Sequence, residues 1–369
     1  GDTDPLGSLT AAAVTISGRS VDVATQVYTG VVTLGADTTF KGTDITFAGI
    51  TGGKNLTVSA TGTSTFGTAI VDTVVNLISD NGGTTVLNAN IETTGTQTYS
   101  DAVTLGAAII TIETSANSDI TFNSTLDAAM PGIESLVITS TGTTTFAGAV
   151  GGTKALLDFT NSTGVSVLSG GGVTTVDDQT YSKITLLANT TLTGTGGTAN
   201  FVFSATATDN NANSFDLTLS SVAGVTLANK FFNDTIRNLA VTDTAGIIIV
   251  GNAGVDAVTT TGKQTYNSGV TATTAAMTLV GTDITFESTL NGGAAAVIVE
   301  GTGATSFNGV VSNTSTLTSD SGGLTKIGAN VTTTGAQDWD AEPVILTGSA
   351  VTLILNAGDK NILLGAVVG

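Results

Sequence analysis

Few side chains in this sequence could carry out catalysis, and they lie beside a recurring signal. The chain has no His and no Cys, so it lacks the usual general base, imidazole metal ligands and thiol nucleophiles. Two carboxylate pairs remain as candidates for acid–base attack on a glycan, Asp177 with Asp178 and Asp338 with Asp340. Both pairs flank a Gln-x-aromatic sequence, which favours solvated turn residues. We therefore expect no enzyme and no catalytic residues.

Three other carboxylates recur at one position of a repeat. Asp44, Asp119 and Asp283 each begin the phrase Asp-Ile-Thr-Phe. We expect successive members to lie about four coils apart, roughly 19 Å at the spacing of neighbouring strands. That distance is too long for a carboxylate dyad, so we interpret them as turn or strand-edge residues.

One segment carries oxygen-bearing side chains of the kind that bind a hard cation. Residues 209–216 offer Asp209, Asn211, Asn213 and Asp216 as candidate Ca²⁺ ligands. The spacing fits neither an EF-hand loop nor the glycine-rich nonapeptide calcium repeat, so a plain Asn-rich loop is the favoured interpretation. We expect no cofactor, with Ca²⁺ as the one candidate. Residues 205–216 are also the exposed loop expected to make any specific contact.

The strongest pattern is a short signal that returns five times: Gln, any residue, then an aromatic residue. Its aromatic members stand at positions 28, 99, 181, 266 and 339, so the interval between them drifts. A fixed signal with a drifting period indicates an internal repeat, which decides the architecture. The signal pairs are Gln26 and Tyr28, Gln97 and Tyr99, Gln179 and Tyr181, Gln264 and Tyr266, and Gln337 and Trp339.

Each large module divides further, because Phe residues follow the signal at regular spacing. Tyr28, Phe47 and Phe66 are equally spaced, and the later modules repeat this with slightly longer intervals. The intervals, roughly 20 to 24 residues, match the length of one coil of a β-solenoid. Stacked coils would place equivalent Phe side chains on one another in the core. The expected core stacks are Phe47 on Phe66, Phe122 on Phe146, and Phe286 on Phe307.

Strand-like alternation accompanies this spacing. Val, Ile, Leu and Phe alternate with Thr and Ser in short runs, as in residues 109–114, and Gly or Asn residues separate the runs. Period-two alternation indicates half-buried strands, and Gly and Asn supply the backbone conformations of tight corners. The sequence predicts an all-β, parallel β-solenoid of about 17 to 18 coils, each of roughly 20–24 residues.

The domain organisation follows from the repeat. No composition break or charged linker occurs, so we predict one continuous solenoid over residues 1–369, with a divergent region at about 190–245. The alternative is a tandem of β-sandwiches of about 75 residues each. It is disfavoured because the similarity extends to single coils, a level at which a sandwich has no reason to repeat.

Charge limits the partners. Lys and Arg number 10 against 29 Asp and Glu, a net charge of −19. No basic stripe exists for nucleic acid, and the acidity opposes anionic membrane surfaces. No segment reaches transmembrane length, so membrane insertion is not expected. The absence of Cys excludes disulfides, and the Thr-, Gly- and Asn-rich composition is typical of secreted bacterial surface proteins.

Both ends of the sequence fall inside a module. Residues 1–27 match the tail of a module, and residues 339–369 begin a new one. An uncapped solenoid end exposes unpaired backbone groups and an apolar cross-section. We therefore expect either flanking coils of a longer parent chain or end-to-end stacking of subunits.

The repeats resemble those of a known class of proteins. Residues 94–99 (TGTQTY) followed by residues 102–107 (AVTLGA) are similar to repeats of filamentous-haemagglutinin-like adhesins and related β-strand-repeat surface proteins of bacteria. The resemblance covers nearly the whole chain except about residues 190–245. It implies a right-handed β-helix, two-partner secretion across an outer membrane, and a role as a fibre or stalk without catalytic residues. The secretion domain of such proteins is not evident.

Together these features predict a non-enzymatic, extracellular structural or adhesive rod, with a host or matrix glycan or protein as a further partner. The alternative is a filament subunit of an extracellular matrix or biofilm fibre. A carbohydrate-active β-helix enzyme is a remote alternative. So is an ice-binding protein, if the Thr residues of 63–65, 143–145 and 332–334 lie on one face. The Gln-x-aromatic signal is expected to be structural rather than a sugar-binding ladder.

Overall fold

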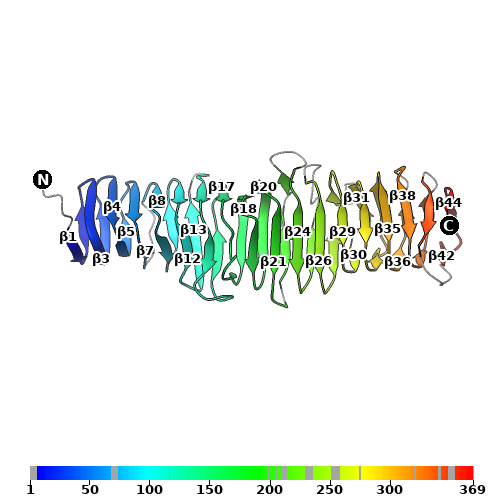
Figure 1. The fold of residues 1–369 in the computed structure, drawn as a ribbon, viewed down its shortest axis with the longest axis horizontal. Coiled ribbons are helices and arrows are strands. Elements are labelled where there is room, and N and C mark those ends of the chain that lie inside the picture. Colours follow the sequence, from blue (N-terminus) through cyan, green and yellow to red (C-terminus); the bar gives the residue numbers. More distant parts are fainter. Residues whose placement is uncertain are drawn as a thin grey trace. The chain divides into compact units, whose positions relative to one another are not determined.

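The fold consists of β-strands, and each of its two compact units is built from parallel strands (Figure 1). The computed structural model describes residues 6–67, 74–115, 117–197, 199–204, 207–209, 214–228, 236–250, 258–273, 276–319, 321–339, 342–347 and 354–368. Unit 1 comprises residues 1–182 and unit 2 residues 183–369. The described residues include no helix that could cross a membrane.

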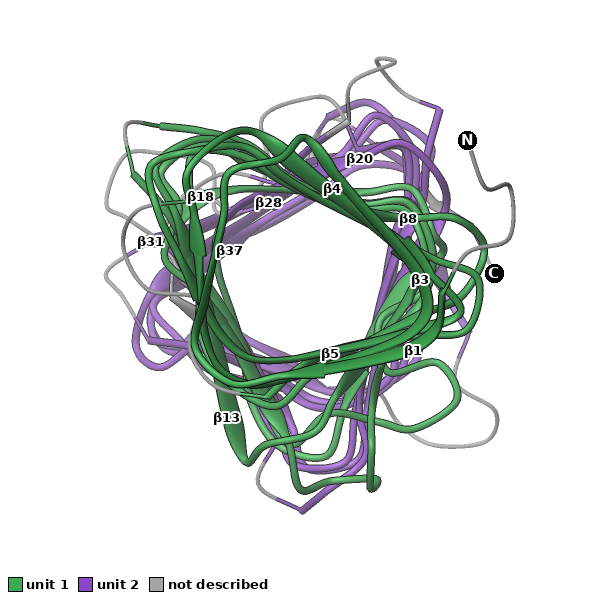
Figure 2. Ribbon diagram, turned by 90° about the vertical axis from the view of Figure 1, so that its left-hand side faces the viewer, with its two compact units in different colours: residues 1–182 green, residues 183–369 purple. Residues whose placement is uncertain are grey.

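Unit 1 winds around three faces, which the chain visits in the order I, II, III (Figure 2). Every recorded pairing is parallel, and it joins a strand to the strand one turn later. Face I contains β1 (Leu6–Ala11), the middle of β3 (Ser20–Leu34), the start of β5 (Asp44–Thr51), β7 (Thr63–Phe66), β9 (Thr84–Leu87), β12 (Ala102–Leu105), β15 (Leu126–Ala128) and β19 (Gly172–Thr175).

The other two faces of unit 1 are built in the same way. Face II contains β2 (Val14–Ile16), the ends of β3 and β5, β10 (Ile91–Thr93), β13 (Ile109–Thr114), β16 (Ser135–Ile138), and the starts of β18 (Phe159–Leu168) and β20 (Gln179–Leu186). Face III contains the start of β3, β4 (Thr38–Gly42), β6 (Leu56–Ala60), β8 (Leu77–Asp80), β11 (Gln97–Tyr99), β14 (Ile120–Phe122), β17 (Thr143–Phe146) and the end of β18.

Unit 2 contains three parallel sheets, visited in a fixed order. The first sheet holds β21 (Thr190–Gly194), β24 (Leu217–Ser221), β26 (Leu239–Asp243), β29 (Gln264–Tyr266), β32 (Ile284–Phe286), β35 (Ala304–Phe307), β38 (Leu324–Ile327), β41 (Val344–Leu346) and β44 (Val367–Val368). The second holds β25 (Val225–Ala228), β27 (Ile247–Val250), β30 (Val270–Ala272), β33 (Leu290–Asn291), β36 (Val311–Thr314), β39 (Val331–Thr333) and β42 (Leu355–Asn356). The third holds β28 (Val258–Thr259), β31 (Ala276–Gly281), β34 (Ala296–Gly301), β37 (Thr316–Thr318), β40 (Gln337–Trp339) and β43 (Ile362–Leu364).

The parallel β-solenoid predicted from the coil spacing is confirmed, with about 15 turns rather than 17 or 18. Uneven turn length explains the difference. Ala11 pairs with Tyr28 across a short turn, whereas Thr190 pairs with Leu217 across a much longer one. The long turn falls in the divergent region, where β21 and β24 still pair in register. The continuity of the solenoid over residues 1–369 stays a prediction.

Aromatic rings stack inside each unit where the signal precedes the Phe phrases. In unit 1, Tyr28 lies on Phe47 with ring centroids 5.3 Å apart, and Phe47 lies on Phe66 at 5.8 Å. The second module repeats this with Phe122 on Phe146 at 5.2 Å. In unit 2, Phe286 lies on Phe307 at 5.4 Å. Such offset stacks bury large apolar rings that also attract one another, so they stabilise successive turns.

The interval between two signals is not a whole number of solenoid turns. Strand β40, which carries Gln337, comes eleven strands after β29, which carries Gln264. With three strands per turn, eleven strands make three and two-thirds turns. Each module therefore places its signal on a different face. In unit 1 Gln26 is on face I, Gln97 on face III and Gln179 on face II.

This offset corrects two expectations: that the recurring Asp residues stack at one place, and that the Thr segments share one face. Asp44 leads into face I and Asp119 into face III of unit 1, so they are not stacked at one place four coils apart. Likewise Thr63 to Thr65 lie on face I, whereas Thr143 to Thr145 lie on face III. A flat Thr surface made from those two segments does not exist in unit 1, because whole modules rotate by two faces.

Candidate functional site

The Gln of the signal is buried and bonds across a corner. The Gln264 side chain is fully buried, and its Nε2 donates to the Val258 carbonyl at 3.3 Å and to the Thr260 hydroxyl at 3.2 Å. The same Nε2 donates at 2.7 Å to the carbonyl of Val280, one turn later. One amide thus joins the corner before the strand to the next turn of the stack.

The same arrangement recurs at three other signals. The Nε2 atoms of Gln97, Gln179 and Gln337 donate to a carbonyl six residues earlier and to a Thr hydroxyl four residues earlier. The Thr residues are Thr93, Thr175 and Thr333, and each donates its own hydroxyl to the carbonyl two residues later. The extended motif is therefore Thr-x-x-x-Gln-x-aromatic, and it describes a corner bracket.

The first module departs from this motif. Asp22 stands where the others have Thr, and Gln26 Nε2 donates to the carbonyls of Val23 at 3.0 Å and Lys41 at 2.7 Å. The Thr four residues before Gln was visible in the sequence, but the sequence interpretation did not use it.

The Tyr of the signal completes the bracket. The hydroxyl of Tyr266 donates to Gln264 Oε1 at 2.8 Å, and the other three Tyr do the same to their own Gln at 2.8 to 2.9 Å. All four rings are buried. Burial raises the pKa of the Tyr28 phenol to about 12 and raises the pKa of Tyr99, Tyr181 and Tyr266 further above the usual value. The signal is therefore not a surface ladder of aromatic rings for sugars.

The fifth signal lacks the last bond. Trp339 replaces Tyr, and its Nε1 finds no hydrogen-bond partner within the described part of the chain. Gln337 Oε1 is also without a partner there, although both side chains are fully buried. A buried polar group without a partner lowers stability, and within the described residues this corner lacks the Tyr–Gln bond of the other four.

The recurring Asp residues cap the following turn. Asp44 Oδ1 accepts the amide of Thr63 at 2.9 Å, and Asp119 Oδ1 accepts the amide of Thr143 at 2.8 Å. In unit 2, Asp283 Oδ1 accepts the amide of Ala304 at 2.9 Å, and its Oδ2 lies 3.0 Å from Lys263 Nζ. Each carboxylate binds a backbone N–H group one turn ahead, which is a structural role.

The structure places the described candidate catalytic residues at a corner and on a strand. Asp178 donates its backbone amide to Asp158 Oδ1 at 3.1 Å, at the corner before β20. Asp338 lies on β40, and Asp340 lies outside the described residues. Within the described part, no three acidic side chains gather where they could hold a metal ion.

Of the four candidate Ca²⁺ ligands, too, some lie within the described residues and others outside them. Asn211 and Asn213 lie outside the described residues, and Asp209 belongs to β23 (Thr208–Asp209). The Asp216 carboxylate binds the guanidinium of Arg237, with Nε–Oδ1 at 2.7 Å and Nη2–Oδ2 at 2.8 Å. Asn238 donates to the same carboxylate at 2.8 Å. These donors, Arg237 foremost, lower the pKa of Asp216.

Asp101 and Glu342 are buried carboxylates beside two equivalent Ser-Asp-x-Gly-Gly sequences. The sequence interpretation did not single out these two carboxylates. Asp101 Oδ1 accepts the amide of Gly82 at 2.7 Å, and desolvation foremost raises the Asp101 pKa. Glu342 Oε1 accepts the hydroxyls of Ser319 and Thr325. The second oxygen of each carboxylate has no partner in the described residues. These side chains are structural supports that leave one polar atom unsatisfied.

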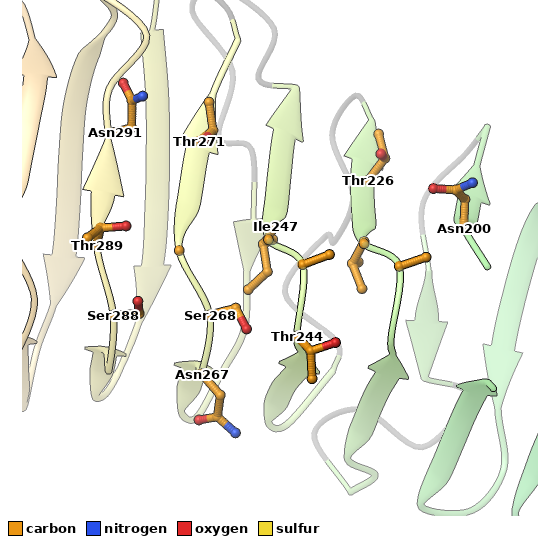
Figure 3. Close-up of a pocket in the computed structure, with 16 residues that line it drawn as sticks. Asn200, Thr226, Thr244, Ile247, Asn267, Ser268, Thr271, Ser288, Thr289 and Asn291 are labelled. Atoms are coloured by element: carbon orange, nitrogen blue, oxygen red, sulfur yellow. The ribbon is translucent and has the colours of Figure 1, made fainter. Parts of the chain in front are cut away.

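A polar groove lies on the surface of unit 2. Its volume is about 600 Å³, and it crosses the corners that follow five successive strands of the first sheet, β21, β24, β26, β29 and β32 (Figure 3). Thr226, Thr271 and Asn291 lie along one side, and Thr244, Ser268 and Ser288 along the other (Figure 3). The lining residues between them include Ala223, Gly224, Ala245, Gly246 and Gly269. None of the described residues that line it carries a charge.

Comparison with known proteins adds no identity. No model of a known protein family, no curated protein and no solved structure matches this chain.

Proposed function

We propose that this chain is a non-enzymatic structural and adhesive β-solenoid element of a bacterial surface, acting outside the cell. The observation that carries the proposal is that the repeated Gln and Tyr side chains are buried and hydrogen-bonded to the stack. Gln97 and Gln264 are fully buried and bonded across corners, and Tyr99 and Tyr266 donate to them. What the sequence repeats is therefore a device for stacking turns, which suits a fibre or stalk.

The distribution of carboxylates supports the non-enzymatic part. The recurring Asp44, Asp119 and Asp283 bind backbone amides of the next turn, and Asp216 binds Arg237. The chain has no His to act as a general base near neutral pH. A glycan-cleaving enzyme would need two free carboxyl groups flanking a binding cleft, and the described residues that line the groove of unit 2 include no carboxylate.

Composition and resemblance support the location. The net charge of −19 favours solubility and mutual repulsion, and it disfavours nucleic acid and anionic membranes. The repeats resemble those of filamentous-haemagglutinin-like adhesins. In that class the solenoid is a spacer that carries binding surfaces away from the cell.

A filament subunit is the second candidate, favoured by an exposed apolar side chain at an inward register position of β43. Leu364 is 42% exposed and pairs with Trp339. Leu279, at the equivalent inward position of β31, is fully buried. Another turn placed on β43 would cover Leu364, and a second copy of the chain is one source of such a turn.

The test combines location with activity. We expect protease added to intact cells of the producing organism to degrade this chain, and we expect the purified chain to release no reducing ends from polysaccharides. Degradation only after lysis, or steady depolymerisation of a glycan, would contradict the proposal. Electron microscopy at several concentrations separates the two candidates, because only a filament subunit lengthens with concentration.

A further inference from the structure

The polar groove of unit 2 is built from stacked corners and therefore repeats along its length. Asn200, Ala223, Ala245, Ser268 and Ser288 belong to successive turns. At about 4.8 Å per turn, the four steps between five corners span roughly 19 Å. A groove with this length suits an elongated ligand, and its volume of about 600 Å³ is within the range of small-molecule sites.

The groove offers uncommitted hydroxyl groups. The side chains of Thr226, Thr271, Ser288 and Thr289 form no hydrogen bond with the described part of the chain. By contrast, the Thr244 hydroxyl donates to the Val222 carbonyl at 2.9 Å, and Ser268 donates to the Asp243 carbonyl. These four hydroxyls, which have no partner among the described residues, stand on both sides of the groove and could donate to and accept from a ligand.

Ala245 and Gly246, between these hydroxyls, are held by hydrogen bonds to the buried Asp243 side chain. The Asp243 carboxylate is buried and accepts the amides of Ala245 at 3.0 Å and Gly246 at 2.9 Å. Gly224 and Gly246 have φ of +146° and +129°, which L side chains rarely adopt. The backbone of this corner is therefore held by hydrogen bonds to Asp243.

Charge and topology narrow the ligand class. None of the described residues that line the groove is Lys or Arg, and the chain carries −19, so an anionic ligand is disfavoured. The strands cross the groove rather than run along it, and their backbone groups pair within ladders such as β25 with β27. A peptide that adds a strand therefore finds no open edge. A chain of uncharged units rich in hydroxyls fits what remains.

We propose that this groove binds a neutral, linear oligosaccharide along the direction in which the turns stack. The hydroxyls of Thr226, Thr271, Ser288 and Thr289, on three of the turns that the groove crosses, would bond to units of the sugar chain. The Ala and Gly corners would allow the sugar rings to approach the backbone. This inference rests on the adhesive part of the proposed function, because it names the class of ligand that the surface would hold.

The test is affinity electrophoresis and calorimetry of the whole chain with neutral polysaccharides (a linear glucan, a mannan and a galactan) and with polygalacturonate as an anionic comparison. We expect at least one neutral polymer to bind, with little effect of salt. Ala245→Trp should abolish binding, because the indole would fill the groove at an exposed position. Thr226→Val with Thr271→Val should weaken it about tenfold, as expected for two lost hydrogen bonds.

The matched control is Ala108→Trp, which adds the same side chain at an exposed corner of unit 1. It should bind as the parent does. Failure of every neutral polymer to bind, binding that survives Ala245→Trp, or binding of polygalacturonate alone would overturn the inference. Protease accessibility on intact cells tests the surface location separately. A chain that is on the surface and binds no neutral polymer would thus refute the groove and not the proposed function.

Discussion

Replacing Tyr266 by Phe removes one hydroxyl from the core and little else. In the structure this hydroxyl lies 2.8 Å from Gln264 Oε1, and both side chains are fully buried. The variant keeps the ring that stacks on Phe286 at 5.4 Å, so no cavity forms. What changes is that Gln264 Oε1 loses its donor in a place that water does not reach.

The magnitude follows from that orphaned acceptor. A buried polar atom without its partner costs about 1–3 kcal/mol, and the loss of the phenol's own desolvation penalty offsets part of this. We expect the free energy of unfolding of unit 2 to fall by about 1.5 kcal/mol, within the range for such a change. With a urea m-value of about 3 kcal/mol/M, the unfolding midpoint would fall by about 0.5 M.

The assay is urea unfolding followed by the fluorescence of Trp339, which is the sole Trp of the chain and is fully buried in unit 2. A double-mutant cycle with Gln264→Met isolates the pair, because Tyr266→Phe should cost little once the acceptor is gone. If Tyr266→Phe unfolds at the parent's urea concentration, or if the cycle gives no coupling, then the bracket does not stabilise the stack.

Three further predictions concern other parts of the chain. Phe122→Asp should abolish cooperative melting of unit 1 by circular dichroism, because it places an unpaired charge in the ring stack; parent-like melting would contradict the stack. Arg237→Gln should lower the melting temperature at pH 7, and the difference should shrink below about pH 4, because Arg237 lowers the pKa of Asp216 and that stability disappears once the carboxyl is protonated; a difference that persists at low pH would contradict the pairing. Asp101→Asn should raise the melting temperature at pH 7 and have no effect on it below about pH 4. The reason is that the raised pKa of Asp101 means that its ionisation costs stability as pH rises. A lower melting temperature of the variant at pH 7 would show that the charge is needed.

The sequence predicted the stacking of turns because aromatic residues mark it directly. The equal spacing of Tyr28, Phe47 and Phe66 gives the turn length, and alternation gives the inward side. It did not predict the change of face between modules, since that depends on how many short strands lie between two signals. Some of the intervening strands, such as Ile91–Thr93 on face II, carry no aromatic marker.

The hydrogen bonds of the candidate sites were harder to predict from the sequence than the stacking of turns. A buried Gln suggests a bracket, but its partners include the carbonyls of Val258 and Val280, and carbonyl positions depend on backbone geometry. The Thr four residues before Gln was the one available clue. The groove could not be predicted, because Ala-Gly corners form a hollow only where register places several of them on successive turns.

Disulfide mapping tests most directly the central claim that the repeated signal builds a three-faced stack and shifts by two faces per module. The chain has no Cys, so introduced pairs are unambiguous. Thr98, in the second signal, pairs with Ile78 on face III. Cys residues at 98 and 78 should form a disulfide under mild oxidation, whereas Cys residues at 98 and 86 should not, because Val86 lies on face I. Efficient cross-linking of 98 to 86, with none between 98 and 78, would contradict this architecture.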